Sequence, residues 1–261
     1  VRVPPLAAVP ETTQRQGPAR GGPKLDDRHI RIVFEDEHLL VVDKSDGLAV
    51  HGGSGIAAGL IERLRASRPP GQFLELAHRL DRDTSGLLVC ARSERAFASL
   101  TAQLASRQMG RRYLAIACGQ TLAQGTVEGN IGRDERNRLR MAVVQPPAGK
   151  PARTHYRLLA ASPDAEAAAI LCKLESGRTH QIRVHMAQIG HPLVGDTLYG
   201  GKPLAGFARQ ALHAWQLQLI HPATQQLQVF VAPIPPDLQA LAAALQIQLP
   251  EQPPAASSER A

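Results

Sequence analysis

The feature that most constrains the fold is a series of short β-rich segments that recur without regular alternation of strand and helix. Branched and aromatic residues concentrate in these segments, and turn-forming residues separate them, as is typical of strands. We expect strands at residues 30–35, 39–44, 87–91, 113–119, 154–159, 168–174 and 227–232. The missing alternation disfavours a doubly wound parallel sheet and predicts an α+β fold with a mixed, mainly antiparallel sheet.

Fewer segments show helical periodicity than show the strand pattern, and both ends of the chain lack it. Apolar residues follow helical spacing at about residues 56–66, 93–105, 178–189 and 237–247. Residues 7–29 are rich in Pro, Gly, Gln and charge, so we expect residues 1–29 to form a flexible linker. The segment 250–261 is similar in composition and is predicted to be a disordered tail. Residues 30–249 remain as one folded domain with helices flanking its sheet.

The charge of the chain points to a polyanionic partner. Its 261 residues carry 30 Lys+Arg against 23 Asp+Glu, a formal net charge of +7. Of the basic residues 25 are Arg, whose planar guanidinium suits phosphate. Aromatic residues make up only 3%, too few for a protein that binds single strands mainly by stacking on bases. If the partner is nucleic acid, phosphate contacts and shape must dominate its recognition.

Cysteine spacing and hydropathy indicate where such a protein works. Cys90, Cys118 and Cys172 stand far apart, which fits small core residues in a reducing compartment better than disulfides or a zinc site. No apolar run approaches the roughly 20 residues that span a bilayer. The chain also shows no charged-then-apolar N-terminal signal. We expect a soluble, cytoplasmic protein with no membrane partner.

The stretch from His78 to Gly86, HRLDRDTSG, is the most unusual in the chain. It directly precedes an apolar strand, which predicts a tight loop projecting side chains from the edge of the sheet. Arg79 and Arg82 flank Asp81 and should keep its carboxylate ionised. Such a carboxylate can attack or stabilise an electron-poor carbon such as a sugar anomeric centre. A surface salt-bridge turn explains the same residues equally well from spacing alone.

A second dense stretch, GRTHQIRVHM, runs from Gly177 to Met186. On a helix, Ile182, His185, Met186 and Ile189 share one face, and Arg183 lies beside it. Gly177 would allow the preceding strand to turn into this helix, and Thr179 would serve as its N-terminal cap. Arg183 would then emerge half-buried, able to pair with a carboxylate.

Other chemistries fit the same residues less well. Residues 83–86 match the Asp-Thr-Ser-Gly loop of aspartic proteases, which need two facing copies, and the chain has one. His180, His185 and His191 have spacings that place them on different faces of a helix, so we expect no metal site.

The motif at residues 78–86 resembles the signature of the RluA family of pseudouridine synthases. Segments 50–55 and 73–76 look closest to its RluC branch, whose members modify large-subunit ribosomal RNA. Four more segments of the chain resemble segments of the family and occur in the same order: residues 112–115, 177–185, 190–200 and 212–214. The resemblance covers roughly residues 30–235.

The resemblance implies the pseudouridine synthase fold with a central RNA-binding cleft, and an enzyme that detaches uracil from ribose, turns it and rejoins it through C5. Asp81 would be the catalytic carboxylate, by attack on the anomeric carbon or by abstraction of a ribose proton; both routes stay open. Tyr113 would lie against the flipped base and assist deprotonation at C5. Arg183 would pair with Asp81, and Arg79 would fill the gap left in the RNA stack.

Besides the catalytic set of Asp81, Tyr113 and Arg183, the resemblance implies RNA contacts. We expect these from His78, Arg79, Arg82, Arg111, Arg112, Arg178 and His180. The partner would be structured ribosomal RNA bound by a monomer, with no metal and no small-molecule cofactor, because an isomerisation needs neither. Alternatives are a synthase acting on transfer RNA and an RNA-binding protein without catalysis. Residues 1–5 resemble the segment that follows an N-terminal S4 domain in the RluC branch, so we expect a catalytic domain cut from a longer protein.

Overall fold

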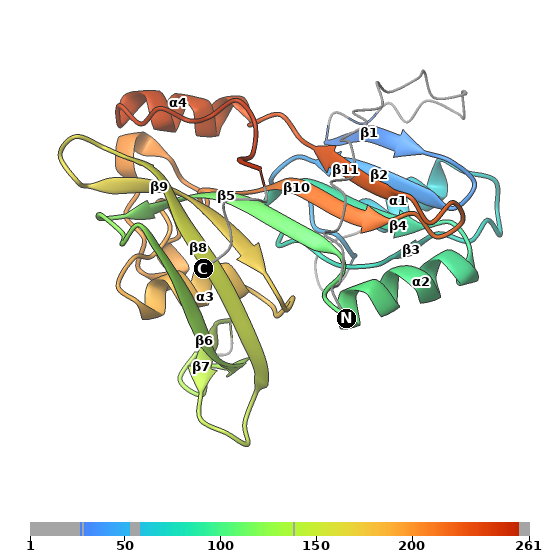
Figure 1. The fold of residues 1–261 in the computed structure, drawn as a ribbon, viewed down its shortest axis with the longest axis horizontal. Helices are drawn as coiled ribbons and strands as arrows, with labels where there is room; N and C mark the ends of the chain where they lie inside the picture. The colour runs from blue at the N-terminus through green and yellow to red at the C-terminus, as the bar shows by residue number, and fades with distance from the viewer. Residues whose placement is uncertain (1–26, 28, 53–57, 138, 256–261) are drawn as a thin grey trace, which may run out of the picture.

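The computed structural model describes residues 27, 29–52, 58–137 and 139–255 (Figure 1). Nearly all of the predicted linker, the predicted S4-adjacent segment and the last part of the predicted tail lie outside these residues. Residues 250–255 of that tail are described and contain no helix or strand. They reach the sheet, where the Pro254 carbonyl accepts a hydrogen bond from Arg112 Nη1 at 2.9 Å.

The strands of the described residues form one sheet, in which a single pair of neighbouring strands is parallel. The strands lie in the order β1 (Ile30–Glu35), β2 (Leu39–Lys44), β4 (Ser85–Ala91), β10 (Leu212–Ile220), β5 (Gly110–Cys118), β9 (Ala167–Leu174), β8 (Lys150–Ala161), β6 (Gln124–Arg133) and β7 (Met141–Val144). In addition, β3 (Glu75–Leu76) pairs with β4, and β11 (Leu227–Val231) pairs with β10. Only β4 and β10 run parallel among the described pairs, which confirms the mixed, mainly antiparallel α+β prediction.

Helices cover both faces of this sheet because its strands bury side chains on both sides. The helices are α1 (Leu60–Ala66), α2 (Glu94–Ala105), α3 (Gln181–Gln188) and α4 (Pro236–Ala244). Leu40 and Val42 share a core cluster with residues of α1 and α3. Their alternate neighbours Leu39 and Val41 pack instead with α2, and α4 packs against a neighbouring cluster (Figure 1). None of the helices in the described part of the chain has the length and apolarity needed to cross a bilayer.

Each predicted element has a counterpart within the described residues, but strands were missed and two helix starts are wrong. Helix α1 begins at Leu60 rather than 56; residues 58 and 59 are not helical, and 56–57 lie outside the described residues. Strands β3, β6, β7 and β10 were not predicted; β6 carries three glycines and polar residues, which hide its pattern. Helix α3 begins at Gln181 rather than 178, and its N-terminal cap is His180 rather than Thr179. The side chain of Gln181 causes this, because its Oε1 accepts hydrogen bonds from Ser176 Oγ and the Arg178 N–H and closes a turn there.

The loop that joins β3 to β4 carries the polar motif, and a buried lysine holds its backbone. Lys44 is fully buried at the end of β2 and donates to the carbonyls of Ser45 and Arg82, both at 2.9 Å. Burial lowers the pKa of Lys44 to about 8, although Asp46 and other carboxylates act to raise it. The backbone of the motif is therefore tied to the interior of the sheet.

Gly86 allows the parallel pairing of β4 with β10 that ends this loop. Its φ is +109°, and a Cβ at this position would lie 2.3 Å from the carbonyl oxygen of Ala214, its partner on β10. No other residue type fits there without moving one strand.

We predict that Gly86→Ala lowers the free energy of unfolding by about 3 kcal/mol, since it adds a backbone clash to a strained φ. Gly71→Ala is the matched control, because Gly71 also has a positive φ of +82° but open space around its Cβ position. The control should lose only about 1 kcal/mol of its free energy of unfolding. Urea titration measures this free energy in both variants. Equal losses in both variants would show that the close approach to Ala214 is unimportant.

Candidate active site

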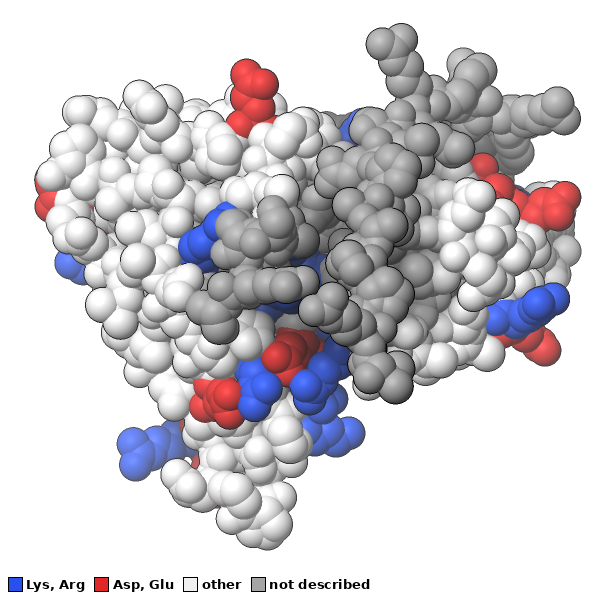
Figure 2. Space-filling view, viewed as in Figure 1, with Lys and Arg blue, Asp and Glu red and all other residues white. Residues whose placement is uncertain are grey.

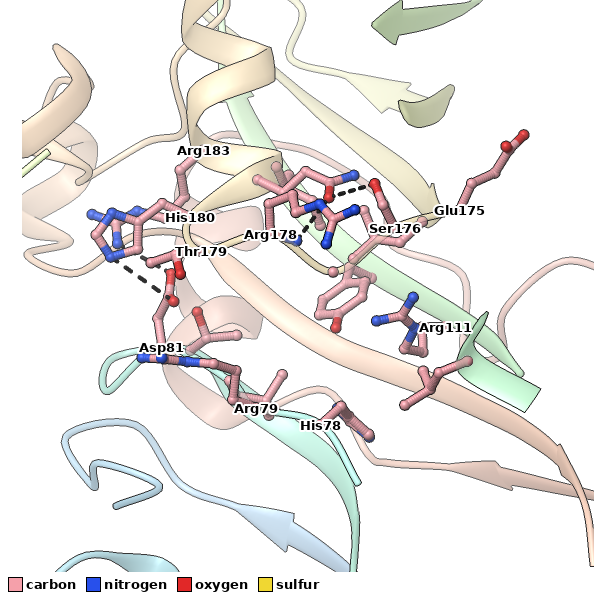
Figure 3. A pocket seen from close by; sticks show the side chains of 18 of the residues that line it. His78, Arg79, Asp81, Arg111, Glu175, Ser176, Arg178, Thr179, His180 and Arg183 are labelled. Atoms are coloured by element: carbon pink, nitrogen blue, oxygen red, sulfur yellow. Dashed lines mark hydrogen bonds and ion pairs between the residues drawn. The ribbon is translucent and has the colours of Figure 1, made fainter. Parts of the chain in front are cut away.

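A cleft of about 510 Å³ opens where the loop before β4, the first half of β5 and the start of β10 meet the N-terminal end of α3 and the C-terminal end of α2. Figure 3 shows side chains from these elements converging on it. The predicted site residues that line it are His78, Arg79, Asp81, Arg111, Tyr113, Arg178, His180 and Arg183. The fold thus brings together most of the predicted set from segments about one hundred residues apart.

Asp81 lies at the mouth of the cleft with both carboxylate oxygens facing basic groups. Its Oδ2 accepts a hydrogen bond from Arg183 Nη1 at 3.1 Å. Its Oδ1 lies 3.9 Å from His180 Nε2, on the same side of the cleft (Figure 3). The Asp81 side chain keeps 16% of its surface exposed, so a ligand in the cleft can reach it.

Arg183 is a fixed cation because a second carboxylate holds it from behind. Asp196, which is 1% exposed, accepts from Arg183 Nε at 2.7 Å and from Nη2 at 2.9 Å. Burial acts to lower the pKa of Arg183, but the hydrogen bonds to Asp196 and the attraction of Asp81 raise it well above its usual range. The bidentate pair leaves Nη1 directed at Asp81.

Tyr113 and Arg111 project into the cleft from alternate positions of β5. Burial raises the pKa of Tyr113, an effect that Arg111 opposes and Asp81 reinforces, so its phenol is neutral at pH 7. Burial also lowers the pKa of Arg111. Gly177 makes room for this side chain, since a Cβ there would lie 2.6 Å from Arg111 Nη1. The glycine was predicted only to turn the chain; it also lies close to the Arg111 guanidinium.

The rim of the cleft carries the more exposed of the predicted basic residues. Arg79 projects from the motif loop and is exposed (Figure 3). Arg178 lies on the opposite side and donates from Nε to the Pro151 carbonyl at 3.1 Å. His180 lies deeper and contacts Tyr199, whose hydroxyl is 2.8 Å from its Nδ1. Together these groups surround the opening above Asp81.

Three predicted RNA-contacting residues differ from this arrangement. Arg112 is buried on the opposite face of β5 from Arg111 and Tyr113, because successive residues of a strand alternate. Arg82 is 63% exposed outside the cleft lining, and its guanidinium pairs with Asp83. His78 lines the cleft wall, but burial and Arg111 lower its pKa to about 3, so its imidazole carries no positive charge at neutral pH.

A second hollow of about 470 Å³ continues the cleft over β6, β7 and β8, and the two share Arg107 and Glu175 in their walls. Glu175 binds Arg107, Arg153 and His155. The hydrogen bond from His155 lowers the pKa of Glu175 against the effect of burial, and the two arginines lower it further. Figure 2 shows acidic and basic side chains gathered together beside strands β6–β8. The arginines here are therefore held by an internal anion.

Asp196 and Tyr199 are the residues of the site to which no role was assigned from the sequence. Both lie in the turn before and within a short 3-10 helix, Thr197–Tyr199. The segment was recognised as family-like, but nothing in a lone Asp indicates pairing with an arginine on the preceding helix. Contact between them depends on how the chain returns after α3, which periodicity does not reveal.

The three histidines weighed as metal ligands have separate partners. Tyr199 binds His180, Thr154 Oγ1 lies 2.9 Å from His185 Nδ1, and the Cys118 carbonyl lies 3.1 Å from His191 Nδ1. Within the described ranges, no group of three or more His, Cys, Asp or Glu side chains is arranged to hold a metal ion.

Comparison with known proteins gives matches over most of the chain. Ribosomal large subunit pseudouridine synthase D of Nitrosomonas europaea is 44% identical over 229 residues, which are 83% of this chain and 65% of that protein. Ribosomal large subunit pseudouridine synthase C of Vibrio cholerae is 38% identical over 246 residues, 92% of this chain and 76% of that protein. The chain thus spans about two thirds to three quarters of the length of these relatives.

Solved structures share the fold. Human RNA pseudouridylate synthase domain containing 4 superimposes with a TM-score of 0.71 at 23% identity, covering 84% of this chain and 94% of that one. Human RNA pseudouridylate synthase domain containing 1 gives a TM-score of 0.64 at 27% identity, covering 88% and 98%. A family model described as RNA pseudouridylate synthase matches residues 38–188, a segment that contains Asp81, Tyr113 and Arg183. The predicted resemblance is confirmed: this chain belongs to the RNA pseudouridylate synthase family.

Proposed function

We propose that this chain isomerises uridines of large-subunit ribosomal RNA to pseudouridine, with Asp81 as the catalytic carboxylate. The observation that carries the proposal is the cleft in which Asp81 faces the buried Arg183 cation and stays open to a ligand. A carboxylate held in this way is oriented before the substrate arrives. A purely RNA-binding surface has no need of an anion among its phosphate-binding groups.

The reaction breaks the bond between N1 of uracil and C1′ of ribose and forms a bond from C5 to C1′. The proton on C5 leaves and N1 gains one, so atoms and electrons balance without an oxidant, a metal or a cofactor. Asp81 acts at the sugar, either on C1′ or on a ribose proton. Tyr113 lies deeper in the cleft, beside Arg111, where its neutral phenol is suited to contact the turned base and exchange the C5 proton.

The target nucleotide must leave its helix to reach Asp81, at a cost of a few kcal/mol that protein contacts offset. In our proposal Arg79 occupies the gap in the RNA stack, because it is the exposed cation of the motif loop. Arg178 and His180 contact the RNA from the opposite rim. The chain would act as a monomer in the cytoplasm, where ribosomes are assembled.

The choice of ribosomal RNA over transfer RNA rests on the names of the relatives, which are large-subunit synthases. Mapping pseudouridines in ribosomal RNA from a strain lacking this gene, with and without the gene restored, tests it. Sites that vanish and return with the gene support the proposal. Unchanged ribosomal RNA together with a lost transfer RNA site would favour the alternative substrate.

We predict that Asp81→Asn abolishes turnover, by at least about 10³-fold, because the amide is neither a nucleophile nor a base. RNA affinity should survive or rise, since one negative charge near the phosphates is removed. Chromatography of nucleosides from digested RNA measures turnover, and filter binding measures affinity. Asp83→Asn is the control: Asp83 lies two residues away and pairs with exposed Arg82, so turnover should stay within a few fold. Turnover retained in Asp81→Asn would show that another group performs the chemistry.

Replacing Arg183 with Lys should lower the single-turnover rate by about 10²-fold with little change in RNA affinity. An ammonium cannot hold Asp196 in a bidentate pair and also donate to Asp81. Arg178→Lys serves as the matched change, since Arg178 lies on the rim and lysine retains its charge. A rate in Arg183→Lys equal to that of the control would contradict the need for a fixed guanidinium.

A further inference from the structure

Tyr199 contacts both basic groups that face Asp81 from the α3 side, His180 and Arg183. The centroid of its ring lies 5.0 Å from the guanidinium carbon of Arg183 and 5.7 Å from the centroid of the His180 ring, which it meets edge to face. On the β6–β7 side, the Arg140 guanidinium carbon lies 5.2 Å from the same ring. We propose that Tyr199 is a positioning residue for the reaction and that its hydroxyl fixes the tautomer of His180, so that the imidazole presents an N–H to Asp81.

The hydrogen bonds of the Tyr199 hydroxyl carry this inference. Its oxygen accepts the backbone N–H of Met141 at 2.9 Å and lies 2.8 Å from His180 Nδ1. The Tyr199 side chain is buried, and among the described residues its hydroxyl has no hydrogen-bond acceptor other than this nitrogen. The phenol proton is therefore donated to His180 Nδ1, which acts as the acceptor.

The tautomer decides what His180 offers to the catalytic carboxylate. With Nδ1 accepting, a neutral imidazole carries its proton on Nε2, the atom 3.9 Å from Asp81 Oδ1. Closure by about one ångström on RNA binding would make this N–H a second donor to Asp81, opposite Arg183. The other tautomer would direct a lone pair at the carboxylate and repel it.

The imidazole is also held in an unusual backbone position. His180 is the N-terminal cap of α3 with a left-handed φ of 56°. A non-glycine residue in this left-handed region is strained and persists only where its surroundings enforce it. The hydroxyl and ring of Tyr199 supply such a constraint and link it to the β6–β7 connection through Arg140 and Met141.

Protonation of His180 removes the need for a fixed tautomer, because imidazolium carries an N–H on both nitrogens. Besides Tyr199, the groups that act on His180 are Asp81, Arg183, Asp196 and Arg79. Burial lowers its pKa; the two carboxylates oppose this and the two arginines add to it. His180 is thus neutral at neutral pH, and the hydroxyl bond to Nδ1 stabilises that neutral form further.

The test is Tyr199→Phe, which keeps the ring and removes only the hydroxyl. This inference rests on the proposed function for its kinetic readout. At pH 8 the single-turnover rate should fall about tenfold with RNA affinity unchanged. The deficit should shrink as the pH is lowered, because a protonated His180 carries an N–H on both nitrogens and no longer depends on the hydroxyl. A deficit that is equal at every pH, or no deficit at all, would overturn the proposal.

Two further measurements separate positioning from simple loss of packing. Tyr156→Phe is the matched control, because Tyr156 is also buried but is not among the described residues that contact His180 or Arg183; its rate and pH profile should not change. In a His180→Gln background, Tyr199→Phe should cost no further rate, since its effect passes through the imidazole. An additive loss would contradict this.

Nitrogen NMR of histidine-labelled protein tests the tautomer without any turnover. His180 should show its proton on Nε2 in the wild-type chain and a mixture of tautomers in Tyr199→Phe. A proton on Nδ1 in the wild type would overturn the inference. Absence of pseudouridine formation by the wild type would instead count against the proposed function and leave this readout intact.

Discussion

The site depends on one buried cation held between two carboxylates. Asp196 takes two of the three guanidinium nitrogens of Arg183, and the third donates to Asp81. Breaking a buried pair of this kind by removing one partner costs about 3–5 kcal/mol, so the geometry is strongly enforced. The three residues come from the motif loop, α3 and the turn that follows α3, and their pairing fixes these segments relative to one another.

The sheet provides the rigid support for this triad. The motif loop ends at the parallel contact of β4 with β10, where Gly86 lets the two backbones approach. Lys44 binds the loop backbone from beneath, and β5 delivers Tyr113 and Arg111 to the opposite wall. Catalytic groups on such supports lose little freedom when a substrate binds, which is what positioning requires.

Local pattern predicted most of the strands, the family resemblance indicated Asp81, Tyr113 and Arg183, and long-range contact decided how they meet. The strands of the core were evident because their apolar runs are short and dense, whereas β6 was hidden by its glycines and polar residues. Arg112 was placed with the RNA-contacting set by the family resemblance, but alternation along β5 turns it to the other face. Arg82 is expected to contact RNA, and its exposed guanidinium pairs with its immediate neighbour Asp83. Asp196 and Tyr199 required knowledge of how the chain returns after α3.

The most direct test of the central claim is tritium release from ribosomal RNA labelled at C5 of uridine. Formation of the C5–C1′ bond expels this hydrogen to water, so release reports the proposed reaction itself. We predict release from large-subunit RNA by the wild-type chain, matched by the pseudouridine formed, and none above background with Asp81→Asn. Undiminished release by the Asp81→Asn protein, or no release from any RNA by the wild type, would contradict the account.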